Sequence, residues 1–435
     1  MEKSKLIKPN LDQIRWAECE IGVIIHLDLC TFSAPYDFRK NFGNPLSSSI
    51  FDPQDLDTDQ WISAAKNLGA RYAILVAKHC TGFSLWPTEA HEYSVKNSPY
   101  KNGEGDIVAE FIASCKKFGV LPGIYCSASC NQYYKIDNGK NIDKDMQKQN
   151  EYNEIVIKQL TELWSNYGEL FEIWFDGGVL PVEEGGPDVV PLLHKLQKKA
   201  VVFQGPIGTR SLVRWVGNER GVAPEDCSAL YHLKAMCEDG TIERDEETCE
   251  DGVVWCPAES DFPNRYAKKS YQGGWFWKEG EDDAVVPAEE LFENYLTSVG
   301  RNTNMLVGMV IDTAGRFPDK DREEFRKAGD MIKRVFSNPL RCDKNTPFSI
   351  SVSADETRAA GYFAVGEDIS RGERIKGYTV YGYGKDGKEI FKKSGKVIGH
   401  KRIFPLPVGV AHVKLEITQT RATPKLKYIE LYPTA

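Results

Sequence analysis

Short, continuously apolar runs alternate with amphipathic helical segments over the first three quarters of the chain, and this alternation constrains the fold more than any other feature. A run without polar residues at every second position predicts a strand that is buried on both faces, as in a parallel sheet. About eight such strands over roughly 330 residues favour an α/β fold of the (β/α)8 barrel type over an open sheet. The expected strands are 21–26, 71–78, 120–125, 171–175, 200–203, 212–216, 252–255 and 305–311.

Helical spacing of apolar residues and capping signals predict helices between these strands. We expect one helix to be capped by Thr58 and to stop at Gly69, and the next to be capped by Asp106 and to stop at Gly119. Side-chain oxygens of Thr and Asp accept hydrogen bonds from the first helical turn, and glycine adopts the left-handed conformation that ends a helix. Further helices are expected at 151–167, 287–300 and 319–336.

The pattern changes after about Pro339. Short alternating runs separated by turn residues replace the helical spacing, which is typical of an antiparallel β-sandwich. We therefore expect a catalytic barrel domain at residues 1–338 and a β-sandwich domain at residues 339–435. The expected sandwich strands are 348–354, 362–365, 375–383, 389–393, 397–400, 413–418 and 426–432.

Charge and composition argue against two classes of partner. The formal net charge of −8 is at odds with the broad basic surface that nucleic acid requires. No apolar run reaches the roughly 18–20 residues of a membrane-spanning helix. Aromatic residues make up 11% of the chain, with nine Trp, which indicates either a large core or a site that stacks on sugar rings. The acid-rich segment Glu238–Glu250 is expected to be a solvated loop.

Cysteine usage and the start of the chain bear on the compartment. The eleven cysteines are an odd number and form no CxxC pair, which favours free, mostly buried thiols and a reducing environment. Residues Met1–Lys5 lack the apolar stretch of a signal peptide. A cytoplasmic protein fits these observations, but a periplasmic or secreted protein trimmed of its signal would look the same. The oligomeric state stays open.

Two carboxylates follow expected strands at the end where barrel enzymes carry their chemistry. Asp176 ends the segment Phe171-Glu-Ile-Trp-Phe-Asp176 and precedes two glycines, and Glu219 ends Val213-Arg-Trp-Val-Gly-Asn-Glu219. Such a pair suits glycosidic cleavage, because one carboxylate attacks the anomeric carbon while the other protonates the leaving oxygen. Taken alone, Asp176 is also typical of a residue that caps a loop, and Glu219 of a solvated surface residue. Glu259, in Trp255-Cys-Pro-Ala-Glu259, is the rival acid.

Two histidines also fall at expected strand ends. His26 ends the first strand, and His79 follows the second in Lys78-His79-Cys80-Thr81-Gly82-Phe83-Ser84-Leu85-Trp86. A lone histidine is usually a satisfied core residue, but two in one barrel mouth favour contacts with sugar hydroxyls, and Trp86 is expected to stack on a sugar ring. No histidine lies in a zinc-ligand motif, so we expect no metal site.

A glycine motif in the sandwich does not change this expectation. Gly382, Gly384 and Gly387 match GxGxxG, but a dinucleotide site needs this motif to open a helix, and a strand is expected here instead. We expect no cofactor, since water and two carboxylates suffice for glycoside hydrolysis.

With these residues in view, the chain resembles the alpha-L-fucosidases of glycoside hydrolase family 29 from about Gln13 to Pro318. The sandwich shows a weaker likeness. The segments that carry the resemblance keep the family's order along the chain: Gln13-Ile-Arg-Trp16, Gly22–His26, Thr31-Phe32, Phe51-Asp-Pro53, Asp59-Gln-Trp61, Tyr72–Leu75, Lys78-His79, Gly82-Phe83, Leu85-Trp86-Pro87 and Tyr93–Pro99.

The resemblance implies a retaining exo-glycosidase that removes terminal alpha-L-fucosyl residues from a fucosylated oligosaccharide or glycoconjugate through a covalent glycosyl-enzyme. The family's nucleophile falls on Asp176 and its acid/base on Glu219. The remaining implied roles concern the sugar: the binding histidines fall on His26 and His79, and the aromatic wall falls on Trp86, with Tyr125 and Trp275 as further wall residues.

Three elements depart from the family pattern. Cys80 and Thr81 stand where the family has a second histidine and an Asp, Ala128-Ser129-Cys130 replaces Pro-Trp-Asp, and Gln272 replaces the Arg of Arg-Pro-Gly-Trp-Phe. A thiol is a weak hydrogen-bond donor, and Gln272 lacks the donor of the family's Arg. We therefore expect Cys80 and Gln272 to weaken L-fucose binding and to broaden sugar tolerance. Two alternatives stay open: the same machinery acting on a galactoside, and a catalytically silent glycan-binding protein. Retention of both carboxylates argues against the second.

Overall fold

The computed structural model describes residues 6–232, 253–343, 348–351 and 360–434. The acid-rich segment expected to form a solvated loop lies outside these residues, as does the end of the strand expected at 348–354.

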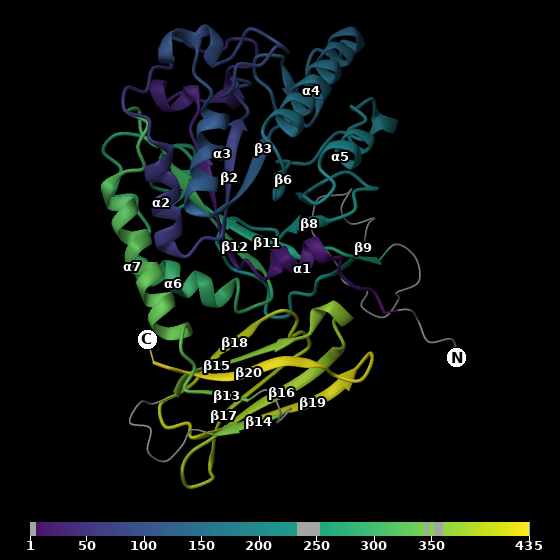
Figure 1. Cartoon of the computed structure of the whole chain (residues 1–435), viewed down its shortest axis with the longest axis vertical. Helices are drawn as coiled ribbons and strands as arrows, with labels where there is room; N and C mark the ends of the chain where they lie inside the picture. Colours follow the sequence, from purple (N-terminus) through teal and green to yellow (C-terminus); the bar gives the residue numbers. More distant parts are fainter. Residues whose placement is uncertain (1–5, 233–252, 344–347, 352–359, 435) are drawn as a thin grey trace.

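Eight parallel strands close into a barrel, which confirms the predicted fold class (Figure 1). Each strand pairs with its two neighbours in a parallel register. In order around the barrel the strands are β1 (Ile21–His26), β2 (Tyr72–Lys78), β3 (Leu121–Cys126), β6 (Glu172–Trp174), β7 (Val201–Phe203), β8 (Leu212–Trp215), β11 (Ala258–Phe262) and β12 (Asn304–Val310).

One predicted barrel strand was wrong. The segment expected at 252–255 is β10 (Val253–Trp255), which pairs antiparallel with β9 (Leu230–His232) outside the barrel. The barrel strand is β11, in which Glu259, Ser260 and Asp261 are all buried. Apolar patterning misses a strand of this kind because its buried side chains are polar and hydrogen-bonded.

Helices cover the outside of the barrel, and their apolar faces form a core against the strands. Asp106 caps its helix as predicted, but Asp57, not Thr58, caps the earlier one: its carboxylate accepts from the Gln60 N–H at 3.0 Å. The helices are α1 (Leu11–Ala17), α2 (Thr58–Leu68), α3 (Ile107–Phe118), α4 (Met146–Asn166), α5 (Val190–Leu196), α6 (Ala288–Thr297) and α7 (Asp319–Phe336).

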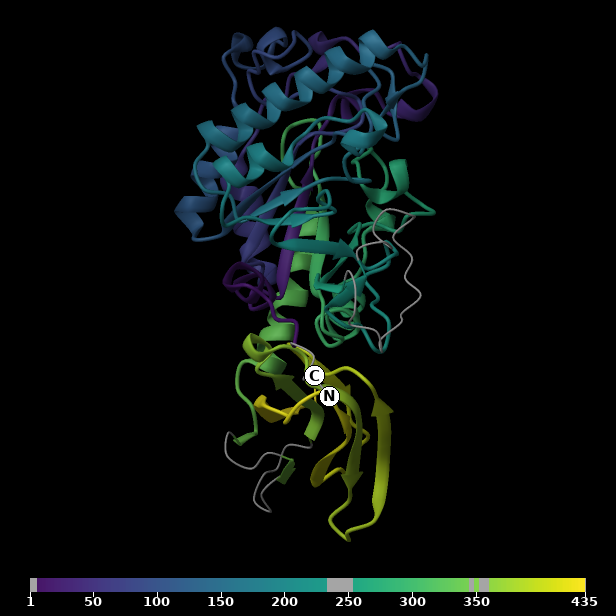
Figure 2. The same ribbon diagram turned by 90° about the vertical axis from the view of Figure 1, so that its right-hand side faces the viewer.

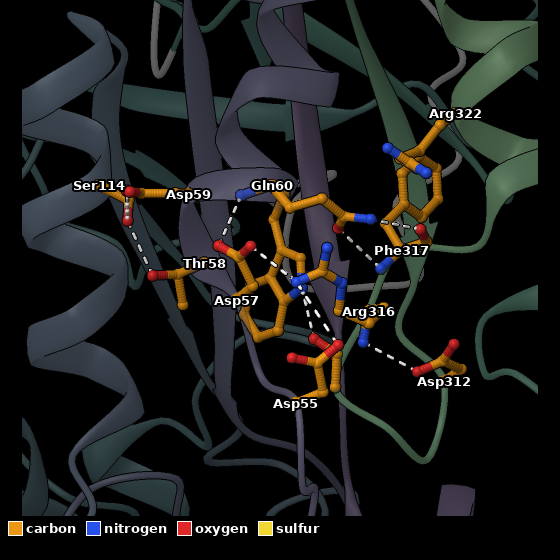
Figure 3. Close-up of polar contacts among 12 residues, drawn as sticks. Asp55, Asp57, Thr58, Asp59, Gln60, Ser114, Asp312, Arg316, Phe317 and Arg322 are labelled. Atoms are coloured by element: carbon orange, nitrogen blue, oxygen red, sulfur yellow. Dashed lines mark hydrogen bonds and ion pairs between the residues drawn. The ribbon is translucent and has the colours of Figure 1, made fainter.

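The loop after the last barrel strand is fixed to the start of α2 (Figure 3). The guanidinium of Arg316 pairs with Asp57 at 2.7 Å, and the Arg316 N–H donates to the Asp312 carboxylate at 2.8 Å. The side-chain amide of Gln60 donates to the Phe317 carbonyl at 2.8 Å and accepts from its N–H at 3.0 Å. These contacts join the first and last segments of the barrel around its carboxyl-end rim.

A β-sandwich of two four-stranded antiparallel sheets follows the barrel. The strand expected at 397–400 lies instead at Arg402–Pro405. One sheet contains β13 (Arg341–Asp343), β20 (Leu426–Pro433), β15 (Ala360–Glu367) and β18 (Arg402–Pro405), and the other contains β14 (Ser349–Ser351), β19 (His412–Thr420), β16 (Ile375–Tyr383) and β17 (Glu389–Gly395). Since α7 ends at Phe336 and β13 begins at Arg341, the expected boundary after residue 338 falls between them and stays a prediction.

The sandwich packs against the amino ends of the barrel strands (Figures 1 and 2). Lys401 forms an ion pair with Glu20, directly before β1. The Asn302 N–H donates to the Lys401 carbonyl and the Ile403 N–H to the Gly300 carbonyl, each at 3.0 Å. The carboxyl ends of the strands therefore face away from the sandwich. No helix in the described ranges is long and apolar enough to cross a membrane.

Candidate active site

A cavity of about 780 Å³ opens at the carboxyl ends of the barrel strands. Most residues that line it end a strand or follow one, as expected for a barrel in which the loops carry the chemistry. Of the seven site residues expected from the sequence, six line this cavity: His26, His79, Tyr125, Asp176, Glu219 and Trp275.

The floor of the cavity is a row of stacked aromatic rings. Tyr125, Trp174 and Phe203 are register partners on β3, β6 and β7, so their side chains point to the same face of the sheet. Tyr125 stacks on Trp174 at 5.4 Å and Trp174 on Phe203 at 3.9 Å between ring centroids, and His79 stacks on Tyr125 at 5.7 Å. Sequence reasoning missed Trp174 and Phe203, although their places at strand ends were the available signal.

Asp176 stands above this floor, two residues after β6. The glycines that follow it, Gly177 and Gly178, have φ angles of +66° and +74°, which an L side chain rarely adopts. The Tyr125 hydroxyl donates to Asp176 Oδ2 at 3.0 Å. Burial raises the pKa of Asp176, the hydrogen bond from Tyr125 opposes that rise, and the nearby charge of Glu219 adds to it. Both carboxylates therefore act on one another across the same cavity.

Glu219 lies on the exposed side of the cavity, in the loop after β8. Its Oε2 accepts from Trp275 Nε1 at 3.2 Å. The ring of Trp275 also lies 5.0 Å from that of His26, so this one indole contacts both the exposed carboxylate and a buried histidine. Such a carboxylate stays accessible to water.

The rival acid Glu259 lies outside the cavity, in the barrel interior. Its carboxylate accepts from the Tyr72 hydroxyl at 2.5 Å and from Trp174 Nε1 at 2.9 Å. Burial raises the pKa of Glu259 to about 7, and burial beside Glu259 raises the pKa of Glu172 well above its usual value. Glu259 thus supports the aromatic floor from below, and the structure does not bring it to the site.

Asp261, two residues after Glu259 on β11, does line the cavity. Its Oδ1 accepts from Trp215 Nε1 at 2.6 Å. Burial raises the pKa of Asp261 well above its usual value, and the charges of Glu219 and Glu259 add to the rise. Sequence reasoning missed this third carboxyl because it missed the strand that carries it.

The two cavity histidines are both buried, with 4% of His26 and 9% of His79 exposed. Their ring centroids lie 6.0 Å apart, and the Phe276 ring packs edge-on against both. Burial lowers the pKa of His26 to about 3 and that of His79 well below its usual value. Both imidazoles are therefore neutral at physiological pH. His26 Nδ1 donates to the Ile24 carbonyl at 3.4 Å, which leaves Nε2 as an acceptor.

The structure does not bring Trp86, the expected aromatic wall, to the cavity. Its ring belongs to the core between the barrel and the helices, and its Nε1 donates to Glu162 Oε2 at 2.9 Å. The sequence placed Trp86 close to His79, but Phe83, Leu85 and Trp86 all belong to that core. Trp174, Trp215 and Trp275 supply the indole surfaces of the cavity instead.

The two altered positions lie in the cavity as well. Cys80 is buried and Gln272 is half-buried, and both line it. The Gln272 side-chain amide donates to the Tyr36 carbonyl at 2.8 Å. Arg39 also lines the cavity, and its charge opposes the rise in the pKa of Asp176.

His79, Cys80 and Asp176 offer potential metal-ligand atoms within 4.8 Å of one another, a grouping that no sequence spacing revealed.

Comparison with known proteins connects this site to a family. The family model described as alpha-L-fucosidase matches residues 31–335. Alpha-L-fucosidase 1 of Arabidopsis thaliana is 31% identical over 98% of this chain and 87% of its own length. A crystal structure from Bacteroides thetaiotaomicron, assigned as an alpha-L-fucosidase, has a TM-score of 0.88 and 32% identity over 99% of this chain and 100% of that one. A glycoside hydrolase family 29 member from an unknown rumen bacterium has a TM-score of 0.80 and 27% identity over 99% of this chain and 78% of that one.

Replacing Tyr125 with Phe tests the electrostatics of the site. The variant loses the donor to Asp176 Oδ2 while keeping the ring stack. Because that hydrogen bond favours the ionised carboxylate by about 0.5–1.5 kcal/mol, we expect the pKa of Asp176 to rise, as measured by carboxyl-carbon NMR during a pH titration. Tyr134→Phe, which has no contact with Asp176, is the matched control and should leave that titration unchanged. An unchanged Asp176 titration in Tyr125→Phe would contradict this account.

Proposed function

The chain belongs to the alpha-L-fucosidase family and is a glycoside hydrolase, and on that premise we propose that it cleaves terminal alpha-L-fucosides with retention of configuration through a glycosyl-Asp176 intermediate. The observation that carries this proposal is the pair formed by Asp176 and Glu219, which line one cavity and lie close enough for the charge of Glu219 to raise the pKa of Asp176. A retaining mechanism needs two such carboxyl groups, one as nucleophile and one as acid and then base.

Asp176 is the better nucleophile of the pair. It stands directly above the aromatic floor, and the anomeric carbon of a bound sugar would lie beside it. The Tyr125 hydroxyl and the Arg39 charge both favour its ionised form. An ionised carboxylate in this position attacks the anomeric carbon as the glycosidic oxygen departs. Tyr125 would hold one oxygen of Asp176 and leave the other free to react.

Glu219 is the better acid and base. The part of the substrate that leaves must exit toward solvent, and Glu219 lies on that exposed side. It would protonate the glycosidic oxygen in the first step and deprotonate the incoming water in the second. Trp275 Nε1 would orient its carboxylate through the 3.2 Å hydrogen bond. Asp261 is a second candidate for the acid, because it lines the cavity and its raised pKa favours the protonated form.

We assign the sugar contacts to His26, His79, Tyr125 and Trp275. Two neutral imidazoles give hydrogen bonds to hydroxyl groups without placing a charge beside the nucleophile. The aromatic floor and the Phe276 ring offer apolar surface to the face and methyl group of a 6-deoxy sugar. The substrate would be a fucosylated oligosaccharide or glycoconjugate, with its fucosyl end inserted and the rest directed to solvent.

A panel of aryl glycosides tests the reaction and the sugar together. We expect hydrolysis of the aryl alpha-L-fucoside and, because Cys80 and Gln272 alter the pocket, measurable hydrolysis of galactosides that share its hydroxyl orientations. NMR of the first-formed sugar should show the alpha anomer. A faster rate on galactosides would shift the assignment to that sugar, and absence of turnover on every member would leave only a glycan-binding role.

Replacing Asp176 with Ala tests the nucleophile. We expect kcat to fall by several decades, because the covalent intermediate can no longer form. Azide or formate should fill the vacated space and restore part of the turnover, and the azide product should have inverted configuration. Asp137→Ala, a change at the exposed residue of β4 (Ile136–Asp137), is the control for unspecific effects. Near-normal activity in a folded Asp176→Ala would remove Asp176 from this role.

Leaving-group dependence distinguishes Glu219 from Asp261 as the acid. A poor leaving group needs protonation and a good one does not, so removing the acid should slow natural fucosides strongly while sparing the first step on a dinitrophenyl fucoside. We expect this split for Glu219→Ala, measured by pre-steady-state release of dinitrophenol. Asp261→Asn should lower both rates to a similar extent. The opposite assignment of the two patterns would make Asp261 the acid.

A further inference from the structure

Three side chains of the cavity form a cluster that the proposed hydrolysis does not require as a unit. His79 and Cys80 follow β2, and Asp176 follows β6. One potential ligand atom from each lies within 4.8 Å of those from the other two. Because these segments are distant in sequence, the cluster has no spacing motif. Among the described residues, these three form the one group of His, Cys, Asp or Glu side chains whose potential ligand atoms lie this close together.

The donor set has a definite chemical preference. An imidazole nitrogen, a thiolate sulfur and a carboxylate oxygen together suit zinc-class cations, whereas Mg²⁺ and Ca²⁺ prefer oxygen ligands alone. Bonds from Zn²⁺ to these atoms are about 2.0–2.3 Å, which places tetrahedral ligands about 3.5 Å apart. Because the ligand atoms lie within 4.8 Å of one another, the cluster would contract by no more than about 1.3 Å on binding, a movement within reach of small side-chain rotations.

His79 supplies a second, independent observation. Its Nδ1 is buried and has no hydrogen-bond partner among the described residues. A buried polar atom of this kind is uncommon in folded proteins and calls for a partner absent from the chain itself. The ring can therefore bind a cation without giving up an existing hydrogen bond of that atom.

Cys80 is held at the cavity edge by its neighbours. Its carbonyl accepts from the Gln132 N–H at 2.7 Å, which fixes the backbone, and its thiol contacts the thiol of Cys130. Of these two cysteines, Cys80 belongs to the cluster with His79 and Asp176, and Cys130 does not. Cys130 therefore serves as an adjacent thiol that should not be required for coordination.

We propose that His79, Cys80 and Asp176 form a binding site for a zinc-class cation, with the fourth coordination position open to the cavity. Coordination replaces the thiol proton, which passes to solvent as the metal–sulfur bond forms. A cation held there occupies a carboxylate oxygen of Asp176 and the imidazole of His79. It therefore inhibits hydrolysis by competing with the sugar, a consequence that rests on the proposed function, whereas the binding itself does not.

Cadmium titration of the whole chain in phosphine reductant tests the site. We expect one Cd²⁺ to bind per chain with the near-ultraviolet absorption of a cadmium–thiolate bond, and calorimetry should show competition with L-fucose. Cys80→Ser should abolish that absorption and weaken binding by at least about tenfold, because it removes a direct ligand. Cys130→Ser, the adjacent control, should retain both. EDTA should restore activity, which separates coordination from thiol oxidation.

Two further variants keep the test decisive. If Cys80→Ser fails to fold, as judged by circular dichroism, His79→Gln and Asp176→Asn should each weaken Cd²⁺ binding to a similar degree. Unchanged affinity in folded Cys80→Ser, or an equal loss in Cys130→Ser, would overturn the site. Stoichiometric binding with full activity would instead support the site and count against Asp176 as the nucleophile, so the two proposals fail in distinguishable ways.

Discussion

The parallel register of β3, β6 and β7 determines the geometry of the whole site. It places Tyr125, Trp174 and Phe203 at one level of the barrel interior, where the strand spacing leaves their rings stacked. The polar atoms of this layer point in two directions: the Tyr125 hydroxyl reaches up to Asp176, and Trp174 Nε1 reaches down to Glu259. A shift of one residue in this register would turn each ring outward and leave both carboxyl groups without these donors.

The same layer of aromatic rings also stabilises a buried acid beneath it, because Trp174 Nε1 donates to Glu259. A carboxyl group inside a barrel is tolerated when its oxygens are hydrogen-bonded or when it is protonated. Glu259 meets the first condition, since Tyr72 and Trp174 donate to it, and burial raises its pKa to about 7, which favours protonation more than for an ordinary Glu. The cavity above differs, because Asp176 lines it and has Arg39 within electrostatic reach. Burial depth and neighbouring charges thus give the carboxyl groups of one barrel different surroundings.

The sequence predicted the barrel, the sandwich and most strand positions because burial on both faces leaves a clear apolar pattern. It could not reveal β11, whose interior residues are acids, or assign that strand's Asp261 to the cavity. It also placed Trp86 in the site by proximity to His79, although its indole belongs to the core, as do Phe83 and Leu85. Contacts between distant segments, such as Trp275 with Glu219, depend on loop paths that local patterns do not encode.

The position of the sandwich has a practical consequence for how the protein can be handled. Because it contacts the amino ends of the barrel strands, the described end of the chain in β20 lies on the side opposite the cavity. A tether, a surface anchor or a fused module added after β20 would keep the mouth unobstructed for a bulky glycan. Attachment through the rim loops near Arg316 and Asp57 would instead strain the ion pair that joins the loop after β12 to the start of α2.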